Sequence, residues 1–197
     1  MNHSAALTIR KFTLAPILAA FMLIYLYIVQ PEIFGFILVP GNISVLIRQL
    51  LFLSLFPLLA YPTQPLISAF RDKGRDGQRY LAMLFAFIGY LLNCILNSCT
   101  HAPWELQMIG WVYLLSGIMI LLVNRLCGFR ASGHAAGVGA VIGIPVVLGH
   151  PSAVIVSLPL MIVVGWASIT TKRHTIQQFA GGLLIPIILT MLLTCMF

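Results

Sequence analysis

Two short polar clusters, each with a histidine among cations, stand directly before long apolar runs. They are Arg130-Ala131-Ser132-Gly133-His134 and Lys172-Arg173-His174-Thr175. Each histidine is expected in the first turn of a helix, where unpaired backbone N–H groups and the helix dipole favour an anion. One imidazole can attack phosphorus, the other can protonate the leaving oxygen, and guanidinium groups can hold the remaining oxygens. The clusters therefore predict phosphoryl chemistry.

The composition excludes a soluble protein. Of the 197 residues, 60% are hydrophobic and only 8% are charged, whereas a soluble domain carries about 25% charged residues. The chain cannot cover its surface with polar groups, so lipid must solvate it. About 200 residues form one domain rather than two, and we expect a single integral membrane domain over residues 1–197.

Seven continuous apolar runs are expected to position the two clusters. They cover residues 13–30, 44–62, 80–98, 106–124, 133–149, 153–170 and 175–196. A transmembrane helix needs about 20 apolar residues. The sequence therefore predicts an all-α fold, a polytopic transmembrane bundle of six or seven helices. Arg10 and Lys11 precede the first run as in a signal peptide, but no small-residue cleavage site follows, so we expect the first helix to be retained.

The charges are few and unevenly placed. The formal net charge is +7, from eleven Lys and Arg against four Asp and Glu. If all seven runs span, ten of the eleven cations share the side of the two clusters, and only Arg48 lies towards the other. In short loops this bias predicts that the N-terminus and both clusters face the cytoplasm. Anionic lipid or phosphate, not nucleic acid, is the expected partner of these cations.

The two clusters resemble motifs of the type-2 phosphatidate phosphatase superfamily, which are membrane-embedded, metal-independent lipid phosphatases. Ala131-Ser132-Gly133-His134 is similar to the Pro-Ser-Gly-His motif of that family. Arg173-His174-Thr175 followed by Gln178 resembles the Arg-His-Thr-x-x-Gln form of its third motif. The separation of the two clusters by two helices also matches, and the similarity extends over about residues 70–185. The resemblance implies a phosphatase-like domain in a bacterial-type inner (plasma) membrane.

The resemblance also implies roles for individual residues. His174 is the expected nucleophile that forms a phosphohistidine, and His134 is the expected general acid. Gln178 is expected to orient the nucleophile by accepting a hydrogen bond from its imidazole N–H. The expected phosphate-binding residues are Ser132, Gly133, Arg173, Arg79, Lys73, Arg130 and Lys172, of which Arg79 and Lys73 (or Arg71) stand for a loosely matched first motif.

We expect no cofactor and no metal, because no two of the five histidines have ligand spacing on one helix. The expected partners are a lipid phosphate substrate and membrane lipids, and no protein partner is indicated. Bacterial members of the family mostly act on the outer face of the inner membrane. The resemblance therefore implies an outward site, opposite to the cytoplasmic orientation that the charge bias predicts.

Two departures from the family keep two functional hypotheses open. Six residues before His174 the family has a phosphate-binding arginine, and this chain has Ser168; four residues after it the family has an acid, and this chain has Gln178. Loss of one charge-assisted hydrogen bond costs about 1.5–3 kcal/mol. The chain is then either a hydrolase of a lipid phosphate or diphosphate, or a catalytically silent member that binds or moves lipid phosphates. If the site is weakened, Ser168→Arg should raise activity or phosphate affinity.

Other conspicuous residues have structural interpretations. Four glycines, at positions 133, 137, 139 and 143, are typical of close helix packing. His101 and His150 are expected in solvated loops on the side opposite the clusters. Arg48 stands in an apolar run, and its long side chain is expected to reach the near interface.

Overall fold

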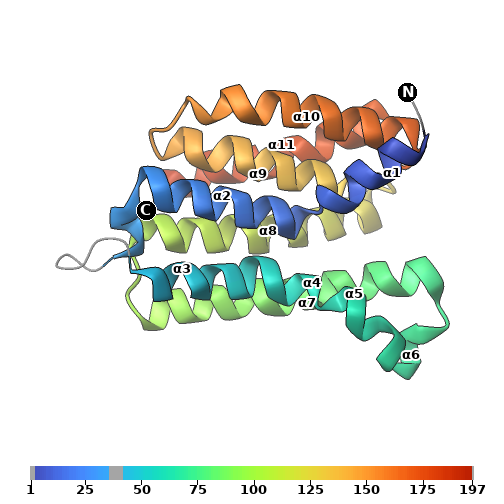
Figure 1. Ribbon diagram of the computed structural model, residues 1–197, viewed down its shortest axis with the longest axis horizontal. Coiled ribbons are helices and arrows are strands. Elements are labelled where there is room, and N and C mark those ends of the chain that lie inside the picture. Colours follow the sequence, from blue (N-terminus) through green and yellow to red (C-terminus); the bar gives the residue numbers. More distant parts are fainter. Residues whose placement is uncertain (1–2, 36–41, 197) are drawn as a thin grey trace.

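The computed structural model describes residues 3–35 and 42–196, and in these ranges the chain forms helices and no strand. The long helices lie side by side in one bundle (Figure 1). They are α2 (Ala15–Val29), α7 (Gly74–Cys99), α8 (Trp104–Leu126), α9 (Gly133–Val147), α10 (Ala153–Thr170) and α11 (Ile176–Thr194). The predicted all-α bundle is confirmed.

The second apolar run folds as an interrupted helix. It comprises α3 (Ile43–Leu50), a π-helical turn (Leu51–Leu55), α4 (Phe56–Leu58), α5 (Ala60–Thr63) and a 3₁₀ turn (Gln64–Leu66), and α6 (Ser68–Arg71) follows it. Proline lacks a backbone donor, and its ring clashes with the carbonyl four residues earlier. The π turn ends just before Pro57, where a wider turn accommodates that ring.

The lengths of the helices define the membrane spans. Five helical segments are long and apolar enough to cross a membrane, and α1 (His3–Phe12) with α2, bent by 55°, makes a sixth if the pair is one span. α9 has only 15 residues, which is about 22 Å at 1.5 Å per residue, against a hydrocarbon core of about 30 Å. α9 is therefore not a candidate full span. The protein is an integral membrane protein with five or six such spans.

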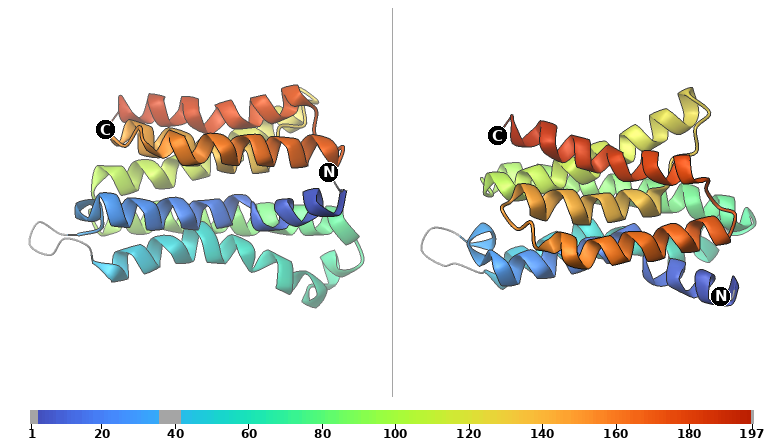
Figure 2. Two further views of the ribbon diagram at one scale, coloured as in Figure 1. Left: turned by 45° about the horizontal axis from the view of Figure 1, so that its top comes forward. Right: turned by 90° about the horizontal axis from the view of Figure 1, so that it is seen from above.

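α9 is the central element of the bundle, packed against α2, α10 and α11 (Figures 1 and 2). Its small residues permit this packing: a Cβ at Gly137 would meet Ala15 of α2, and a Cβ at Gly139 would meet the backbone of Leu183 in α11. Gly143 likewise faces α11. The packing role expected for these three glycines is confirmed. Gly133 has open space where a Cβ would lie, so helix packing does not explain it.

The helices alternate in direction, which separates the bundle into two ends. The loops before α9 and α11, the helix α1 and the start of α7 gather at one end, which we call the histidine end (Figure 1). The start of α3, the end of α7 and the start of α8 meet at the opposite end, which we call the Arg48 end. Both predicted histidine clusters lie at the histidine end.

Candidate functional site

Two hydrogen bonds join the two histidine clusters, although 44 residues separate His174 from Arg130. The imidazole Nδ1 of His174 lies 3.1 Å from the carbonyl oxygen of Arg130. The backbone N–H of Ser132 donates to the carbonyl of Gln178 at 3.1 Å. The loop before α9 is thereby held against the loop before α11 and the first turn of α11.

Two adjacent glycines at the start of α11 make this contact sterically possible. A Cβ at Gly182 would overlap the backbone of Ser132, and a Cβ at Gly181 would lie 2.7 Å from the ring of Phe129. Because those atoms are backbone and a packed ring, any larger residue would push α11 away from the start of α9. In the sequence, the adjacent glycines Gly181 and Gly182 are the only sign of this contact.

Local capping explains why both histidines sit at helix starts. The fully buried Ser132 accepts a hydrogen bond from the N–H of Ala135 at 3.3 Å, as the N-cap of α9. Thr175 caps α11 in the same way, and Gln178 completes a capping box by accepting from the N–H of Thr175 at 3.2 Å. Such caps satisfy backbone donors that would otherwise have no partner.

The hydrogen bond of His174 determines its tautomer. A carbonyl oxygen can only accept, so Nδ1 carries the proton and Nε2 keeps its lone pair. Burial lowers the pKa of His174 below its usual range. The hydrogen bond to the Arg130 carbonyl opposes this shift, the positive charges of Arg10 and Arg79 add to it, and the Gln178 side chain has the smallest effect, in the raising direction. His174 is therefore a neutral imidazole at pH 7, with a nucleophilic nitrogen free.

Gln178 does not provide the main hydrogen bond to His174. The Arg130 carbonyl takes the Nδ1 proton, and the amide oxygen of Gln178 completes the α11 cap. The side chain of Gln178 lies near enough to His174 to raise its pKa slightly. The orienting contact expected from Gln178 is thus supplied principally by a backbone carbonyl.

His134 lies deeper than His174 and contacts α1. Its Nε2 is 3.1 Å from the carbonyl oxygen of Arg10, so Nε2 donates and Nδ1 is left to exchange a proton. Burial, followed by the charge of Arg10, lowers the pKa of His134 to about 4. His134 is therefore neutral at pH 7.

Arg10 is the site residue that the sequence did not identify. Its Nη1 donates to the hydroxyl of Ser168 at 3.1 Å, across 158 residues of sequence. It stands beside Lys11 before an apolar run, where a cation is typical of a topology signal. No sequence spacing links it to either histidine, so only the fold reveals this contact.

The expected phosphate-binding cations have three different placements. Arg79 of α7 lies close enough to lower the pKa of His174. Lys73, in contrast, places its Nζ 5.5 Å from the ring centroid of Phe70, which favours a structural role. The side chains of Arg130, Lys172 and Arg173 are exposed around His174.

A shallow hollow of about 350 Å³ opens beside His174. It is lined by Ile169, Lys172, Arg173, His174, Thr175 and Gln178. Lys172 has a positive φ of 52°, a left-handed turn that reverses the chain between α10 and α11. Ser132 and His134 do not line this hollow, and Gly133 is exposed at the start of α9. Among the described residues, no three His, Cys, Asp or Glu side chains group as metal ligands would.

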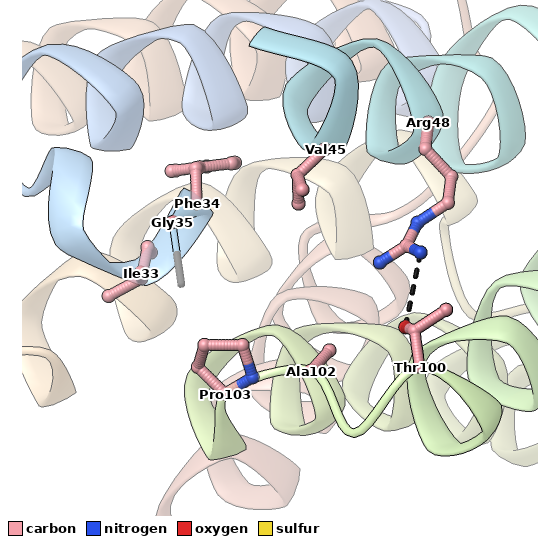
Figure 3. A pocket seen from close by; sticks show the side chains of 8 residues that line it. All are labelled: Ile33, Phe34, Gly35, Val45, Arg48, Thr100, Ala102 and Pro103. Carbon is pink, nitrogen blue, oxygen red and sulfur yellow. Dashed lines mark hydrogen bonds between the residues drawn. The ribbon is translucent and has the colours of Figure 1, made fainter. Parts of the chain in front are cut away.

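The Arg48 end contains a second pocket of about 250 Å³, formed mainly by apolar side chains (Figure 3). The guanidinium of Arg48 is hydrogen-bonded there, with Nη1 donating to Thr100 at 3.1 Å and Nη2 to Asn97 at 3.2 Å. Its Nε is buried and has no partner in the described part of the chain. Arg48 thus lies at the end of the bundle, hydrogen-bonded to polar side chains at the C-terminal end of α7.

The two other histidines differ from each other. His150 lies 3.2 Å from the side-chain oxygen of Gln30 and edge-on to Tyr25, so it is a structural residue and not a free loop histidine. His101 is exposed, as expected, at a positive φ of 48°. Neither belongs to the histidine end.

Comparison of the chain with protein-family models, with curated proteins and with solved structures finds no match. The fold and the apolar spans define the class as a polytopic α-helical membrane protein. The functional argument therefore depends on the chemistry of the histidine end.

Proposed function

We propose that the protein hydrolyses the phosphomonoester or diphosphate of a membrane lipid through a phosphohistidine on His174. The observation that carries the proposal is the hydrogen bond from His174 Nδ1 to the Arg130 carbonyl. It leaves Nε2 unprotonated beside a hollow lined by two cations, Lys172 and Arg173. An anionic phosphate is attracted there, and the nucleophile needs no separate base because it is already neutral.

In the proposed mechanism Nε2 of His174 attacks phosphorus while the bond to the lipid oxygen breaks. The departing oxygen takes a proton from His134, which received it from the phosphate monoanion as the substrate bound. Water then attacks phosphorus, the new O–P bond forms as the N–P bond to His174 breaks, and a proton of the water goes to His134. Inorganic phosphate takes that proton as it leaves, which returns His134 to its neutral form. The cations stabilise the charge on the equatorial oxygens in both steps.

The surroundings of the hollow favour a lipid over a soluble phosphate ester. Ile169 lines the hollow, and Ile176, two residues after the nucleophile, has 72% of its surface exposed. In a membrane these side chains contact acyl chains. A headgroup phosphate can therefore occupy the hollow while its chains stay in the lipid.

The second candidate is a silent member that binds or moves lipid phosphates, and Ser168 favours it because the expected arginine is missing from α10. Purified protein in lipid nanodiscs, presented with phosphatidate, a lysophosphatidate and an isoprenyl diphosphate, separates the two. Hydrolysis supports the enzyme, whereas saturable binding of these lipids without phosphate release supports the silent member.

The matched variants are His174→Asn and His101→Asn. Asparagine keeps a donor for the Arg130 carbonyl at position 174, and it tolerates the left-handed backbone at position 101. We expect phosphate release to fall at least ~10³-fold in His174→Asn and to stay within about twofold of wild type in His101→Asn. Wild-type turnover in His174→Asn would contradict the assignment of the nucleophile.

We further propose a bacterial-type inner membrane location with the histidine end facing the cytoplasm. The support is the charge bias of the short loops. A single cysteine at Ser4 or Lys73 in a cysteine-free background can be treated in intact cells with a membrane-impermeant maleimide. Protection until the cells are permeabilised is expected, and labelling of intact cells would place the histidine end outside.

A further inference from the structure

Ser168 occupies the position on α10 where the family resemblance implies an arginine. Its side chain is fully buried, and its hydroxyl accepts a hydrogen bond from Nη1 of Arg10 at 3.1 Å. A guanidinium thus lies beside position 168 although the residue there is serine. It comes from α1 and not from α10.

Arg10 also contacts the expected general acid. Its carbonyl oxygen accepts the Nε2 proton of His134 at 3.1 Å, and its positive charge lowers the pKa of both histidines. α1 packs along α10, which fixes the helix that carries Arg10. One residue therefore links Ser168, His134 and, through its charge, His174.

The guanidinium of Arg10 has more donors than acceptors around it. An arginine side chain has five N–H donors, and the hydroxyl of Ser168 is its hydrogen-bond acceptor in the described structure. The charge that acts most on it is another cation, Arg75. The one ion pair within residues 3–35 and 42–196, Arg71 with Asp72, is exposed and does not include Arg10. A half-buried cation in cationic surroundings is stabilised by an anion.

We propose that Arg10 supplies a phosphate-holding guanidinium of this site, in place of an arginine at position 168, and that Ser168 positions it. The planar fork of arginine matches two phosphate oxygens at once. α1 then lines the site and, where the bent pair of α1 and α2 is one span, also begins that span. This inference rests on the proposed function, because it names a further ligand of the same phosphate.

The proposal reverses the effect expected for Ser168→Arg. In the wild-type background, a second guanidinium would enter a buried position that Arg10 already adjoins, and like charges would repel. We therefore expect Ser168→Arg to weaken phosphate binding. The same substitution should strengthen binding when Arg10 is replaced by Gln.

The first test measures the affinity for inorganic phosphate by calorimetry on the full chain in nanodiscs, together with kcat and KM for a short-chain phosphatidate. Arg10→Gln should weaken phosphate binding by about 10–100-fold and raise KM. Lys11→Gln, which removes the adjacent exposed cation of α1, is the matched control and should change either quantity by about twofold at most.

The double variant Arg10→Gln/Ser168→Arg separates phosphate binding by Arg10 from a purely structural role, because only the first predicts a recovery of phosphate affinity. It should regain about tenfold or more of the affinity lost in Arg10→Gln, because it returns a guanidinium from another helix. If Arg10→Gln fails to fold, Ser168→Ala tests the same point: the loss of the hydroxyl should weaken phosphate binding while thermal stability in phosphate-free buffer is retained.

The outcomes distinguish this inference from the proposed function. Wild-type phosphate affinity in Arg10→Gln, or no recovery in the double variant, would overturn the role of Arg10 while hydrolysis by wild-type protein leaves the function standing. Absence of both phosphate binding and hydrolysis in wild type would overturn the proposed function, and the inference with it.

Discussion

The two ends of the bundle surround a partly buried arginine in different ways. At the Arg48 end, the guanidinium donates to Thr100 and Asn97. Asn97 in turn accepts from Gln49 at 2.7 Å and donates to Asn93 at 3.1 Å. At the histidine end, the hydroxyl of Ser168 is the side-chain partner of Arg10 in the described structure, and the surrounding groups are further cations and imidazoles.

This difference separates a structural arginine from a ligand-binding one. The amides at the Arg48 end form a network whose donors and acceptors are nearly all paired, so the network stabilises the contact of α3, α7 and α8. At the histidine end, Arg10 has one side-chain acceptor in the described part of the chain, Ser168, and the charges that act on it and on the two histidines are positive, which favours a bound anion. A partly buried arginine therefore indicates a binding site where its neighbours are cations and imidazoles rather than side-chain amides, and the variants that follow test that distinction.

Among the variants that compare the two ends, the largest effect is expected at His134, the proposed general acid. His134→Asn should lower kcat by about 10²–10⁴-fold, because the leaving oxygen then departs without a positioned proton donor. His150→Asn at the opposite end, where the histidine contacts Gln30, should leave kcat within about twofold. Rates of phosphate release from a phosphatidate measure both, and equal losses in the two variants would mean that the effect is structural.

Asn97→Leu, at the Arg48 end, should lower the stability of the fold and leave the histidine end unchanged. It leaves Arg48, Gln49 and the carbonyl of Leu106 without the partner that Asn97 provides, at a cost of about 1–3 kcal/mol for each orphaned group. We expect unfolding in mixed micelles at a denaturant concentration clearly below that of wild type. Phosphate affinity of the folded fraction should not change, and a change would show that the two ends are coupled.

Gly182→Ala tests whether the contact of α9 with α11 assembles the histidine end. The new Cβ would overlap the backbone of Ser132, and such overpacking costs about 1–3 kcal/mol. Gly117→Ala in α8, where a Cβ meets open space, is the matched control and should slightly stabilise the protein. We expect phosphate release to fall in the first variant only. Full activity in Gly182→Ala would show that the close approach is not required.

The smallest expected effect is a pH dependence. Because the pKa of His174 is lowered from 6.5, the nucleophile stays neutral below that pH, and the acid limb of kcat/KM should have its midpoint below pH 6.5. Because the pKa of His134 is about 4, its proton must arrive with the phosphate monoanion, whose second pKa is about 6. The rate should therefore decline towards pH 8, and a rate that rises up to pH 8 would contradict this proton assignment.

The fold could be predicted largely from hydropathy, because lipid requires long apolar helices. All seven runs form helical segments, and the small-residue pattern of α9 correctly indicated close packing at Gly137 and Gly139. Hydropathy did not predict that α9 is shorter than a span, or that the helix widens before Pro57. Those features depend on helix ends and on local sterics.

The site could be predicted only in part. Capping residues placed His134 and His174 at helix starts, and local sequence carries that signal. The Arg130 carbonyl as partner of His174, and the contact of Arg10 with Ser168, depend on how distant helices pack. The position of a backbone carbonyl cannot be predicted from residue types. For that reason Gln178 was expected to orient His174, whereas the main hydrogen bond to His174 comes from the Arg130 carbonyl.

The most direct measurement of the central claim is a trapped phosphoenzyme. Wild-type protein is mixed with ³²P-labelled phosphatidate, quenched with alkali within milliseconds and digested, since phosphohistidine survives base and not acid. We expect label on the peptide that contains His174. The label should be absent from His174→Asn, and it should accumulate in His134→Asn if the attack of water slows more than the first step. Hydrolysis without any labelled peptide, or with label that persists in His174→Asn, would contradict a covalent intermediate on this histidine.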